Sequence, residues 1–459
     1  MTVNPSIWIE SLDLEAQGIG RLPENDDVPG KVIFIRGALP TEHVRYQITR
    51  EKTRFSKAKL TEVIQPAVFR IDPQCAVFGI CGGCSMQHLD MRAQIAMKQR
   101  VLEDDLWHIG RIRPSEIMRP IIGPSWHYRQ RARFSVIDRS IKKGTMLIGF
   151  HEHNSSYVTD MLACEVIPRR VSNLLPWLRT LIGALSVRSF VPQIELAVGE
   201  IDPQRDLHSE TITLVIRHLK PLSEADLTHL RCFADEHQVW IWLQAQGIDS
   251  AKPFHPPTGH LFYTLPEFEI EMPFLPTDFT QVNHALNRVL VSKALQLLEP
   301  QAHERILDLF CGIGNFTLPI ARLAKQAVGV EGLSALIERA TNNAVHNALS
   351  DKTHFLANDL FTANAQMLAS WGNVDRWLID PPREGAHEVC RALLDLPRNY
   401  WPKRIVYVSC NPKTLARDAA ILVHEAGYEL SKAGIMNMFP HTSHIESLAV
   451  FNLNENASC

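Results

Sequence analysis

The sequence predicts an α/β protein made of three parts: a small N-terminal β-barrel, a central α/β domain and a C-terminal Rossmann-like domain. The first 65 residues hold short strand-like runs separated by glycines. Between Met146 and Leu275 such strands alternate with helical segments. From about Phe274 the alternation becomes closely spaced, which is typical of a doubly wound parallel sheet. We therefore expect domains at residues 1–65, 66–272 and 273–459.

The composition is that of an ordinary globular protein. Hydrophobic residues make up 45% of the 459 residues and charged residues 21%, and the net charge of −3 excludes a global basic field for nucleic acid. The N-terminus lacks the basic-then-apolar layout of a signal peptide, and no apolar run reaches the ~18 residues of a membrane span. We expect a cytoplasmic monomer.

The N-terminal strands are predicted at residues 7–12, 32–35 and 43–48, where β-branched and aromatic residues gather. Between Thr41 and Leu60 there are six basic residues and only two acidic ones. This local excess of positive charge could bind phosphates. The basic residues are Arg45, Arg50, Lys52, Arg54, Lys57 and Lys59. A solvated hairpin face is the plain alternative. The arrangement resembles the TRAM domain, a small RNA-binding barrel of the oligonucleotide-binding type found on RNA-modifying enzymes.

A cysteine cluster with the spacing Cys-x5-Cys-x2-Cys follows the barrel. Its members are Cys75, Cys81 and Cys84. Gly82 and Gly83 let the backbone wrap closely, so that several thiolates can point at one centre. Without an export signal, clustering favours a metal over disulfides. Cys164 is the candidate for the fourth ligand and His88 is its competitor. Zinc and a [4Fe–4S] cluster both accept four thiolates, and the spacing does not choose between them.

The middle of the chain adds a helix at residues 90–109 and a strand at residues 128–134. Alternation on that strand places Arg129, Arg131 and Arg133 on one face, which suits contact with an RNA backbone or with solvent. Residues 253–257, which include two adjacent prolines, are predicted to be a linker.

A glycine turn marks the C-terminal domain. The strand around Asp308 leads into Phe310-Cys-Gly312-Ile-Gly314-Asn315, and a helix follows. This turn resembles the Asp-x-Phe-x-Gly-x-Gly loop of S-adenosylmethionine-dependent methyltransferases. A second strand ends in Glu331, whose carboxylate can accept hydrogen bonds from both ribose hydroxyls of the cofactor. A third strand ends at Asn358, within reach of an adenine.

The next two strands end in the residues that we expect to carry the chemistry. One ends in Asp380-Pro381-Pro382-Arg383, where the prolines stiffen the turn, and the other in Ser409-Cys410-Asn411-Pro412. A thiolate that adds to C6 of a pyrimidine gives C5 carbanion character, and C5 can then attack a sulfonium methyl group. Arg383 stands where amino-methylating relatives carry an aromatic residue, which argues against methylation of an exocyclic amine.

A base must then remove the C5 proton. Glu446 begins an alternating strand and shares its face with Leu448 and Val450, and such surroundings raise a carboxyl pKa. His441 and His444 are rivals for this role.

Taken together, the glycine turn, the Asp-Pro-Pro-Arg turn, the Ser-Cys-Asn-Pro turn and His444-Ile-Glu446 resemble the RNA uracil-C5-methyltransferase family. The barrel and the cysteines resemble its bacterial large-subunit ribosomal RNA branch. The resemblance implies that Cys410 is the nucleophile and Glu446 the base, and that a flipped uridine of 23S ribosomal RNA is the substrate. It also implies residues that line the pocket for S-adenosylmethionine and uracil, and four ligands of a [4Fe–4S] cluster. The pocket residues are Gln281, Phe310, Asn315, Glu331, Asn358 and Asp380, and the cluster ligands are Cys75, Cys81, Cys84 and Cys164.

Four other functions share part of this pattern. The same chemistry on another uridine, in ribosomal or transfer RNA, is one of them. Radical enzymes with a TRAM domain use Cys-x3-Cys-x2-Cys, which differs from the spacing here. Cytosine-C5 RNA methyltransferases carry a further cysteine after the proline of the fourth-strand motif, where this chain has Pro382-Arg383. An intact Cys410 with Glu446 argues against a non-catalytic RNA-binding metalloprotein.

Overall fold

The computed structural model describes residues 4–13, 15–22, 30–200 and 210–454 of the chain. These residues form two compact units. The first comprises Met1–Val101, Phe150–Thr159 and Phe439–His444, and the second comprises Leu102–Gly149, Asp160–Met438 and Ile445–Cys459. The predicted boundary between residues 272 and 273 falls inside a strand, β15 (Ile270–Phe274), and the three-domain division stays a prediction.

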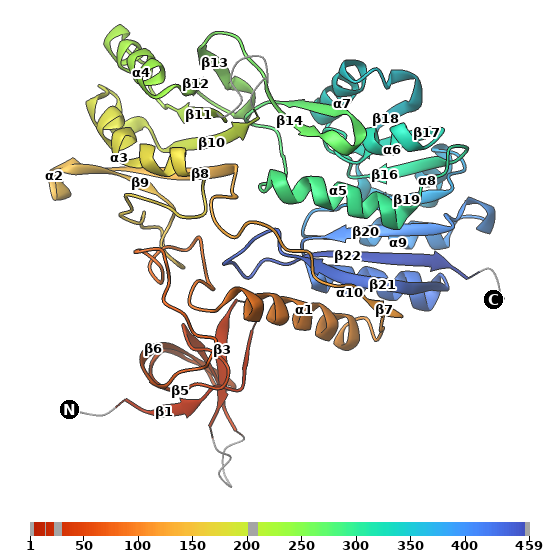
Figure 1. Cartoon of the computed structure of the whole chain (residues 1–459), viewed down its shortest axis with the longest axis horizontal. Coiled ribbons are helices and arrows are strands. Elements are labelled where there is room, and N and C mark those ends of the chain that lie inside the picture. The colour runs from red at the N-terminus through yellow and green to blue at the C-terminus, as the bar shows by residue number, and fades with distance from the viewer. Residues whose placement is uncertain (1–3, 14, 23–29, 201–209, 455–459) are drawn as a thin grey trace. The chain divides into compact units, whose positions relative to one another are not determined.

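The described part of the first unit contains a strongly bent antiparallel and parallel sheet in the order β1-β5-β6-β4-β3-β2 (Figure 1). Its strands are β1 (Ser6–Trp8), β2 (Ser11–Leu12), β3 (Gln17–Arg21), β4 (Val32–Arg36), β5 (His43–Glu51) and β6 (Phe55–Gln65). The two edge strands, β1 and β2, are consecutive in the chain, so the segment that contains them joins both edges of the sheet. Ile9 strengthens this closure, because its N–H donates to the carbonyl of Glu42 at 2.9 Å. The predicted β-rich N-terminal region is confirmed, and Ile33, Ile35 and Val44 form part of its core.

Two of these strands had no clear signal in the sequence. β3 contains two glycines, and β6 has more exposed than buried positions, so neither shows the apolar alternation that marks a half-buried strand. A Cβ on Gly18 would lie 2.9 Å from Ala38 Cβ, so the glycine permits a close approach of two backbones.

The second unit holds the central domain, whose sheet has the order β13-β12-β11-β10-β8-β9. The strands are β8 (Arg131–Arg139), β9 (Thr145–Gly149), β10 (Gln193–Gly199), β11 (Thr211–Arg217), β12 (Trp240–Gln244) and β13 (Lys252–His255), and the helices are α2 (Ser140–Lys143), α3 (Arg169–Ala184) and α4 (Glu224–His237). The predicted linker at residues 253–257 is wrong in its first part, because Pro253 pairs with Trp242 in β13. Proline is tolerated there because β13 is an edge strand.

The C-terminal sheet has the order β18-β17-β16-β19-β20-β22-β21-β7, and β18 through β20 run parallel. Its strands are β16 (Arg305–Leu309), β17 (Gln326–Glu331), β18 (Thr353–Ala357), β19 (Arg376–Ile379), β20 (Arg404–Ser409), β21 (Tyr428–Met436), β22 (Glu446–Leu453) and β7 (Glu116–Ile117). A hairpin of β14 (Leu261–Leu265) with β15 precedes it. The inner strands β16, β17, β19, β20 and β22 are largely buried, as the apolar runs of a doubly wound sheet require, whereas the edge strands β18 and β7 have no fully buried residue. The predicted Rossmann-like fold is confirmed.

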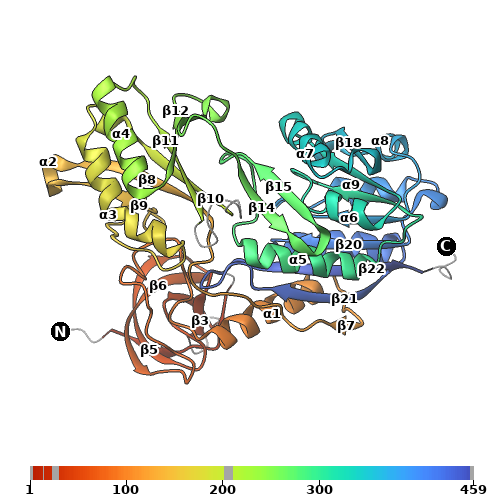
Figure 2. The ribbon, with the colours of Figure 1, turned by 45° about the horizontal axis from the view of Figure 1, so that its top comes forward.

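Helices flank this sheet, and Figures 1 and 2 show α5 lying along its strands. They are α5 (His284–Leu298), α6 (Thr317–Leu323), α7 (Ser334–His346), α8 (Ala365–Ser370), α9 (His387–Leu394) and α10 (Pro412–Ala420). A further helix, α1 (Met91–His108), lies where the sequence predicts it. None of the helices in the described ranges combines the length and apolarity needed to cross a membrane.

The strand order reverses at β16, because β17 and β18 continue to one side of it and β19 and β20 to the other. In open α/β sheets, ligands bind beyond the carboxyl ends of the strands at such a point. A ligand site is therefore expected at this edge of the sheet.

Candidate active site

Three chemically active side chains meet at the carboxyl edge of the C-terminal sheet. Asp380 follows β19 and Cys410 follows β20, and Ile379 is paired with Tyr407 between these parallel strands. β22 runs antiparallel to β20, with Ser409 opposite Ser447. Cys410 and Glu446 each come one position beyond this last pair, and the Glu446 carboxylate acts electrostatically on the Cys410 thiol.

The turn that carries Cys410 is held by local hydrogen bonds. The Ser409 hydroxyl accepts a hydrogen bond from the Asn411 N–H at 3.1 Å and donates one to the Asn411 carbonyl at 3.0 Å. Asn411 then caps α10, since its side chain accepts from the Lys413 N–H, and Pro412 occupies the first turn of that helix. The half-buried thiol therefore sits on a rigid strand-to-helix turn.

The thiol is surrounded by acids. Burial, followed by the carboxylates of Glu446 and Asp380, raises the pKa of Cys410 to about 12, and Arg383 opposes this. Burial raises the pKa of Asp380 to about 7. Burial and the nearby Asp380 raise the pKa of Glu446 well above the usual range of a carboxyl group. Without substrate the thiol is thus protonated at neutral pH, and Asp380, whose pKa lies near neutrality, is the adjacent acid that is partly ionised and able to accept a proton.

The glycine turn after β16 has the shape that a ligand requires. Gly312 has a φ of +55°, and a Cβ on it would meet no described atom within 4 Å, so the backbone is open on that side. Asp308 is fully buried beneath the turn and accepts a hydrogen bond from the Thr317 hydroxyl. Burial, with a contribution from Asp380, raises the pKa of Asp308 to about 8, so this acid is mostly protonated at neutral pH.

Two of the predicted cofactor residues end neighbouring strands. Glu331 accepts hydrogen bonds from the Gly312 N–H at 3.3 Å and the Leu333 N–H at 3.2 Å, which aims its carboxylate across the glycine turn. Asn358 follows β18 and accepts a hydrogen bond from the indole of Trp371 at 3.1 Å, so its amide group remains available to donate.

The other three cofactor candidates differ in what they can offer. Phe310 has a φ of +63° and its ring lies 5.8 Å from that of Phe361. The Gln281 side chain has no hydrogen-bond partner among the described residues and precedes α5. Asn315, by contrast, is engaged: its amide bonds Asn287 in both directions and accepts from the Tyr263 hydroxyl at 2.8 Å. Its side chain therefore fixes the glycine turn, with both acceptor positions of its oxygen used and one N–H of its amide group left to donate to a ligand.

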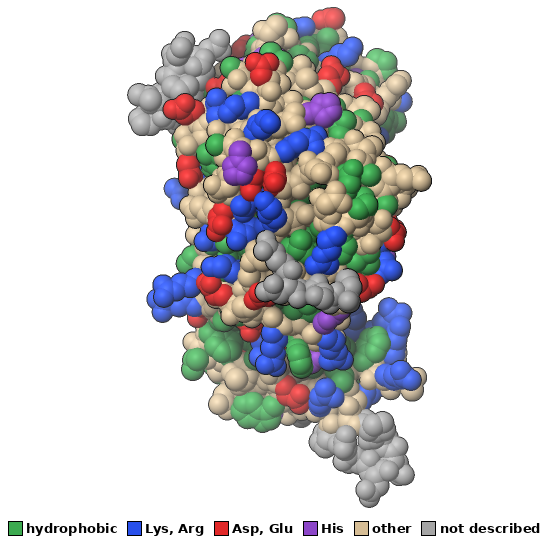
Figure 3. Space-filling model, turned by 90° about the vertical axis from the view of Figure 1, so that its right-hand side faces the viewer, with side chains coloured by type: hydrophobic (Ala, Val, Ile, Leu, Met, Phe, Trp, Pro, Cys, Tyr) green, Lys and Arg blue, Asp and Glu red, His purple; other side chains and the backbone are tan. Residues whose placement is uncertain are grey.

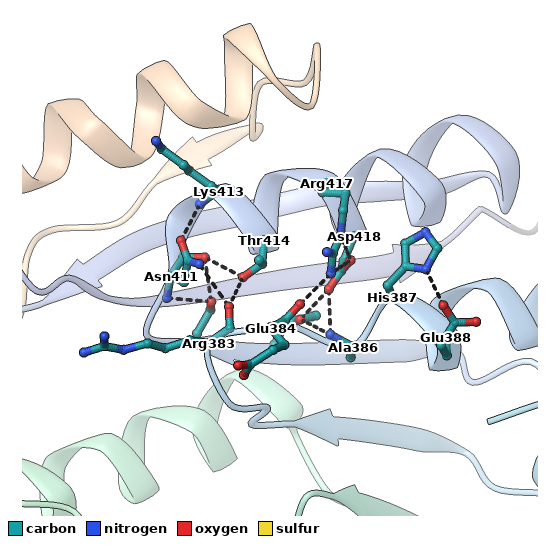
Figure 4. Close-up of polar contacts among 12 residues, drawn as sticks. Arg383, Glu384, Ala386, His387, Glu388, Asn411, Lys413, Thr414, Arg417 and Asp418 are labelled. Carbon is teal, nitrogen blue, oxygen red and sulfur yellow. Dashed lines mark hydrogen bonds and ion pairs between the residues drawn. The ribbon is translucent and has the colours of Figure 1, made fainter. Parts of the chain in front are cut away.

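The loop after Asp380 is tied to α10 by a network that the sequence interpretation missed (Figure 4). The carbonyl of Arg383 accepts from the Asn411 amide at 3.0 Å, and the N–H of Ala386 donates to Asp418 at 2.8 Å. One feature of the sequence could have indicated this network. Asp418 lies three residues after Leu415 and four before Leu422, and such a charge on an apolar helix face needs buried partners.

The two histidines that rival Glu446 belong to the first compact unit. The backbone N–H of His441 donates to the Gln94 side chain at 2.9 Å, and the ring Nδ1 lies 3.3 Å from the Gln94 amide nitrogen. The ring of His444 lies 5.7 Å from that of Phe439. These contacts hold the loop that leads into Glu446.

The cysteines are divided between the two units. The loop of Cys75, Cys81 and Cys84 belongs to the first unit, where the Gly83 N–H lies 3.4 Å from the Cys81 sulfur. Cys164 is buried in the second unit, and its N–H donates to Ser172 at 2.9 Å. In the described ranges, no three or more His, Cys, Asp or Glu side chains are grouped as a metal site. The neighbouring His88 is buried, and burial lowers its pKa to about 4.

The predicted arginine face is only partly correct. β8 begins at Arg131, so Arg129 lies outside the strand. The backbone N–H of Arg129 donates to the carbonyl of Val166 and not to a neighbouring strand of the sheet. The Arg131 guanidinium donates to the carbonyl of Asp278. Arg133 is exposed and lies 3.0 Å from Glu195. On the face drawn in Figure 3, Lys and Arg side chains lie among Asp and Glu side chains, in keeping with the net charge of −3.

The chain is similar to known RNA uracil-C5-methyltransferases in both sequence and fold. Residues 268–453 match the family model described as tRNA (Uracil-5-)-methyltransferase. The fold is similar to the crystal structure of the Pyrococcus abyssi tRNA (uracil-54, C5)-methyltransferase in complex with S-adenosyl-L-homocysteine. The TM-score is 0.71 at 20% identity, and the alignment covers 97% of this chain and 100% of that one.

Relatives of higher identity span the whole chain. A protein of Polynucleobacter necessarius named 23S rRNA (uracil(1939)-C(5))-methyltransferase RlmD is 60% identical over 97% of this chain and 96% of its own length. Proteins of the same name are similar as well. The one from Cupriavidus metallidurans is 55% identical, over 98% of this chain and 95% of its own length. The one from Ralstonia pickettii is 55% identical, over 98% of this chain and 99% of its own length.

Proposed function

The chain belongs to the RlmD family of 23S rRNA (uracil-C5)-methyltransferases, and we propose that it methylates C5 of one uridine in 23S ribosomal RNA through a covalent adduct with Cys410. The relatives act, by their names, on uracil 1939, and we assign the same target here. The observation that carries the proposal is the register of β20 and β22, which ends with Ser409 opposite Ser447 and so brings Cys410 and Glu446 to the same end of the strand pair. We expect the protein in the cytoplasm and as a monomer.

In the proposed reaction, the Cys410 thiol gives its proton to the Asp380 carboxylate, which leaves Glu446 for the later step, and its sulfur adds to C6 of the uracil. This addition makes C5 nucleophilic, and C5 takes the methyl group as the bond between that methyl and the sulfonium sulfur breaks and the neutral thioether leaves. Glu446 then accepts the C5 proton, the C5–C6 double bond re-forms and the sulfur leaves C6. The elevated pKa of Glu446 suits a group that must hold this proton.

S-adenosylmethionine, when bound, supplies the electrophilic methyl group. We propose that Glu331 receives the ribose hydroxyls and Asn358 the adenine, while Gln281 and Phe310 line the same pocket. The open backbone at Gly312 fits a ligand of this kind. Asp380 stands between this pocket and the thiol, and Asn315, which fixes the glycine turn, also lines the pocket with its remaining amide N–H.

A target base inside folded RNA must be flipped outward, which costs on the order of a few kcal/mol. We propose that the first 65 residues are a TRAM-type barrel whose basic strands β5 and β6 bind phosphates and offset this cost. Phe279, which is 68% exposed, is suitably presented to stack on the flipped base or its neighbour. The exposed Arg133 is the arginine of the predicted face that can exchange Glu195 for a phosphate.

We also propose that Cys75, Cys81, Cys84 and Cys164 hold a [4Fe–4S] cluster. Four thiols are the donor set of such clusters. A Cβ on Gly82 would lie 3.0 Å from the carbonyl of His151, so the glycine lets the cysteine loop pack closely. Anaerobic purification followed by iron and sulfide analysis tests this: four of each per chain support a cluster. One zinc per chain, or no metal, contradicts it.

The methyl-transfer proposal is tested with a 23S ribosomal RNA fragment that contains 5-fluorouridine. Fluorine at C5 blocks the last proton removal, so the methylated RNA should stay bound to Cys410 in a denaturation-resistant complex. The Cys410→Ala variant should form none. An adduct with Cys410→Ala, or none with the wild-type protein, contradicts the proposal.

The base is tested with ordinary uridine. Glu446→Gln should form the methylated adduct with natural RNA and retain it, because the C5 proton has no acceptor. His444→Ala is the matched control and should turn over without accumulation. Accumulation with His444→Ala and free turnover with Glu446→Gln would assign the base to the histidine.

A further inference from the structure

Two turns that carry the proposed chemistry are joined by contacts between the loop at residues 383–386 and the start of α10. Two backbone carbonyls of this loop accept hydrogen bonds from Asn411 and from side chains of α10. The carbonyl of Arg383 accepts from Asn411 at 3.0 Å and from Thr414 at 3.2 Å. The carbonyl of Glu384 accepts from Arg417 at 2.8 Å. Figure 4 shows these side chains pointing from α10 toward the loop.

Asp418 is the centre of this network. It is fully buried, and one of its oxygens accepts hydrogen bonds from the Ala386 N–H and the Tyr407 hydroxyl, each at 2.8 Å. Its other oxygen accepts from the Arg417 guanidinium at 2.8 Å. Burial and the adjacent carboxylate keep the pKa of Tyr407 far above neutrality, so its hydroxyl is a permanent donor. A carboxylate with this many donors is rigidly placed.

Gly385 shows how close the loop and helix are. A Cβ at this position would lie 2.6 Å from an Asp418 oxygen and 2.9 Å from the Cβ of Thr414, and the φ of Gly385 is +81°. Only glycine fits both the backbone conformation and the contact.

We propose that Asp418 is a positioning residue that holds the Asp380–Ala386 loop and the Cys410 turn in one fixed geometry. This inference rests on the proposed role of Cys410. The loop carries Asp380 and Arg383, which both act electrostatically on the Cys410 thiol. If the loop shifted against α10, their distances to the sulfur and to the uracil would change. Misplacement of reacting groups by about 1 Å can slow a reaction by the order of 10²-fold.

The experiment measures the single-turnover rate of adduct formation on 5-fluorouridine RNA, together with the dissociation constant for S-adenosylmethionine. Asp418→Ala removes the acceptor, and Gly385→Ala separates loop and helix without a change in charge. Asp418→Asn is the conservative variant, because one amide oxygen can still accept from Ala386 and Tyr407. Glu425→Gln is the matched control, since Glu425 forms a half-exposed pair with Arg391 at 2.5 Å.

We expect Asp418→Ala and Gly385→Ala to slow adduct formation at least tenfold while cofactor affinity stays within twofold of wild type. Asp418→Asn should recover most of the rate, and Glu425→Gln should match wild type. If Asp418→Ala does not fold, the positioning role is tested with Gly385→Ala and Tyr407→Phe, through the same rate of adduct formation and the same cofactor affinity.

Rates within twofold of wild type in folded Gly385→Ala and Asp418→Ala would overturn the positioning role. So would a parallel loss of cofactor affinity, because that would indicate a general disturbance of the domain. If the wild-type protein itself formed no adduct, the proposed function would fail and the inference with it. A wild-type adduct with unimpaired variants rejects the positioning role alone.

Discussion

The double variant Asp380→Asn/Glu446→Gln is expected to make Cys410 more reactive toward iodoacetamide while methyl transfer is lost. The wild-type thiol has its pKa raised from 9.0 to about 12. At pH 8.5 a thiol of this pKa is ionised to only ~0.03%, and the two carboxylates cause part of that suppression. Because the pKa of Asp380 is about 7, the pair carries at least one negative charge at this pH.

Removal of one nearby charge should lower the pKa of Cys410 by about one unit. The thiolate fraction then rises about tenfold. A less basic thiolate is also a weaker nucleophile, with a Brønsted coefficient of about 0.4–0.5, so the intrinsic reactivity falls about threefold. The expected net result is alkylation about three- to fourfold faster than in the wild-type protein.

The assay follows the Cys410 peptide by mass spectrometry after timed exposure to iodoacetamide at pH 8.5. Cys232 is exposed in α4 and serves as the internal reference for reagent. Glu425→Gln is the control for the loss of a carboxylate elsewhere. An unchanged or slower reaction at Cys410, with equal labelling of Cys232, would refute the view that these two acids suppress the thiol.

Three further predictions concern the surroundings of the site. Glu331→Gln should weaken binding of S-adenosylmethionine by about tenfold in calorimetry, because hydrogen bonds to a carboxylate contribute about 1.5–3 kcal/mol; equal affinity would exclude the ribose contact. The pKa of Asp308 is raised from 3.8 to about 8, so its contribution to stability is complete below pH 3.8 and is lost as the pH rises through 8. Asp308→Asn, which stays neutral, should therefore lose less Tm than wild type between pH 7 and 9, and an identical Tm profile would argue against the raised pKa. Arg133→Glu should weaken RNA binding and reduce the salt dependence by about one phosphate contact, whereas an unchanged slope would remove Arg133 from the interface.

The sequence predicted most of the catalytic strands because each is a short apolar run that ends in a polar residue. Asp380, Cys410 and Glu331 stand where predicted, since parallel strands bring their carboxyl ends to one edge. The predicted alternation of strands and helices between Met146 and Leu275 was equally correct, as β10, α4 and β12 show. Periodicity is local, so it identifies elements and their ends without knowledge of their partners.

Partners are what the sequence could not supply. Arg131 and Arg133 have the same residue type and the same strand face, yet one is bound to the carbonyl of Asp278 and the other is exposed beside Glu195. Asn315 follows the glycine turn as a cofactor residue would, but Asn287 and Tyr263, which are distant in sequence, occupy its amide. Charge and spacing do not report which groups a fold brings together.

The direction of the last strand is the step on which the site depends most. A parallel β22 would have brought its final residues to the carboxyl edge, and Glu446 would lie at the opposite end of the sheet. Instead β21 and β22 form an antiparallel pair, and Glu446 is opposite Met436 at the end of β21. The chain therefore returns at the catalytic edge through residues 437–445, and the first residue of β22 enters the site. Each neighbour of Cys410 thus comes from a strand end, Asp380 from the carboxyl end of β19 and Glu446 from the amino end of β22. Only a mixed sheet can combine an acid from each kind of end around one thiol.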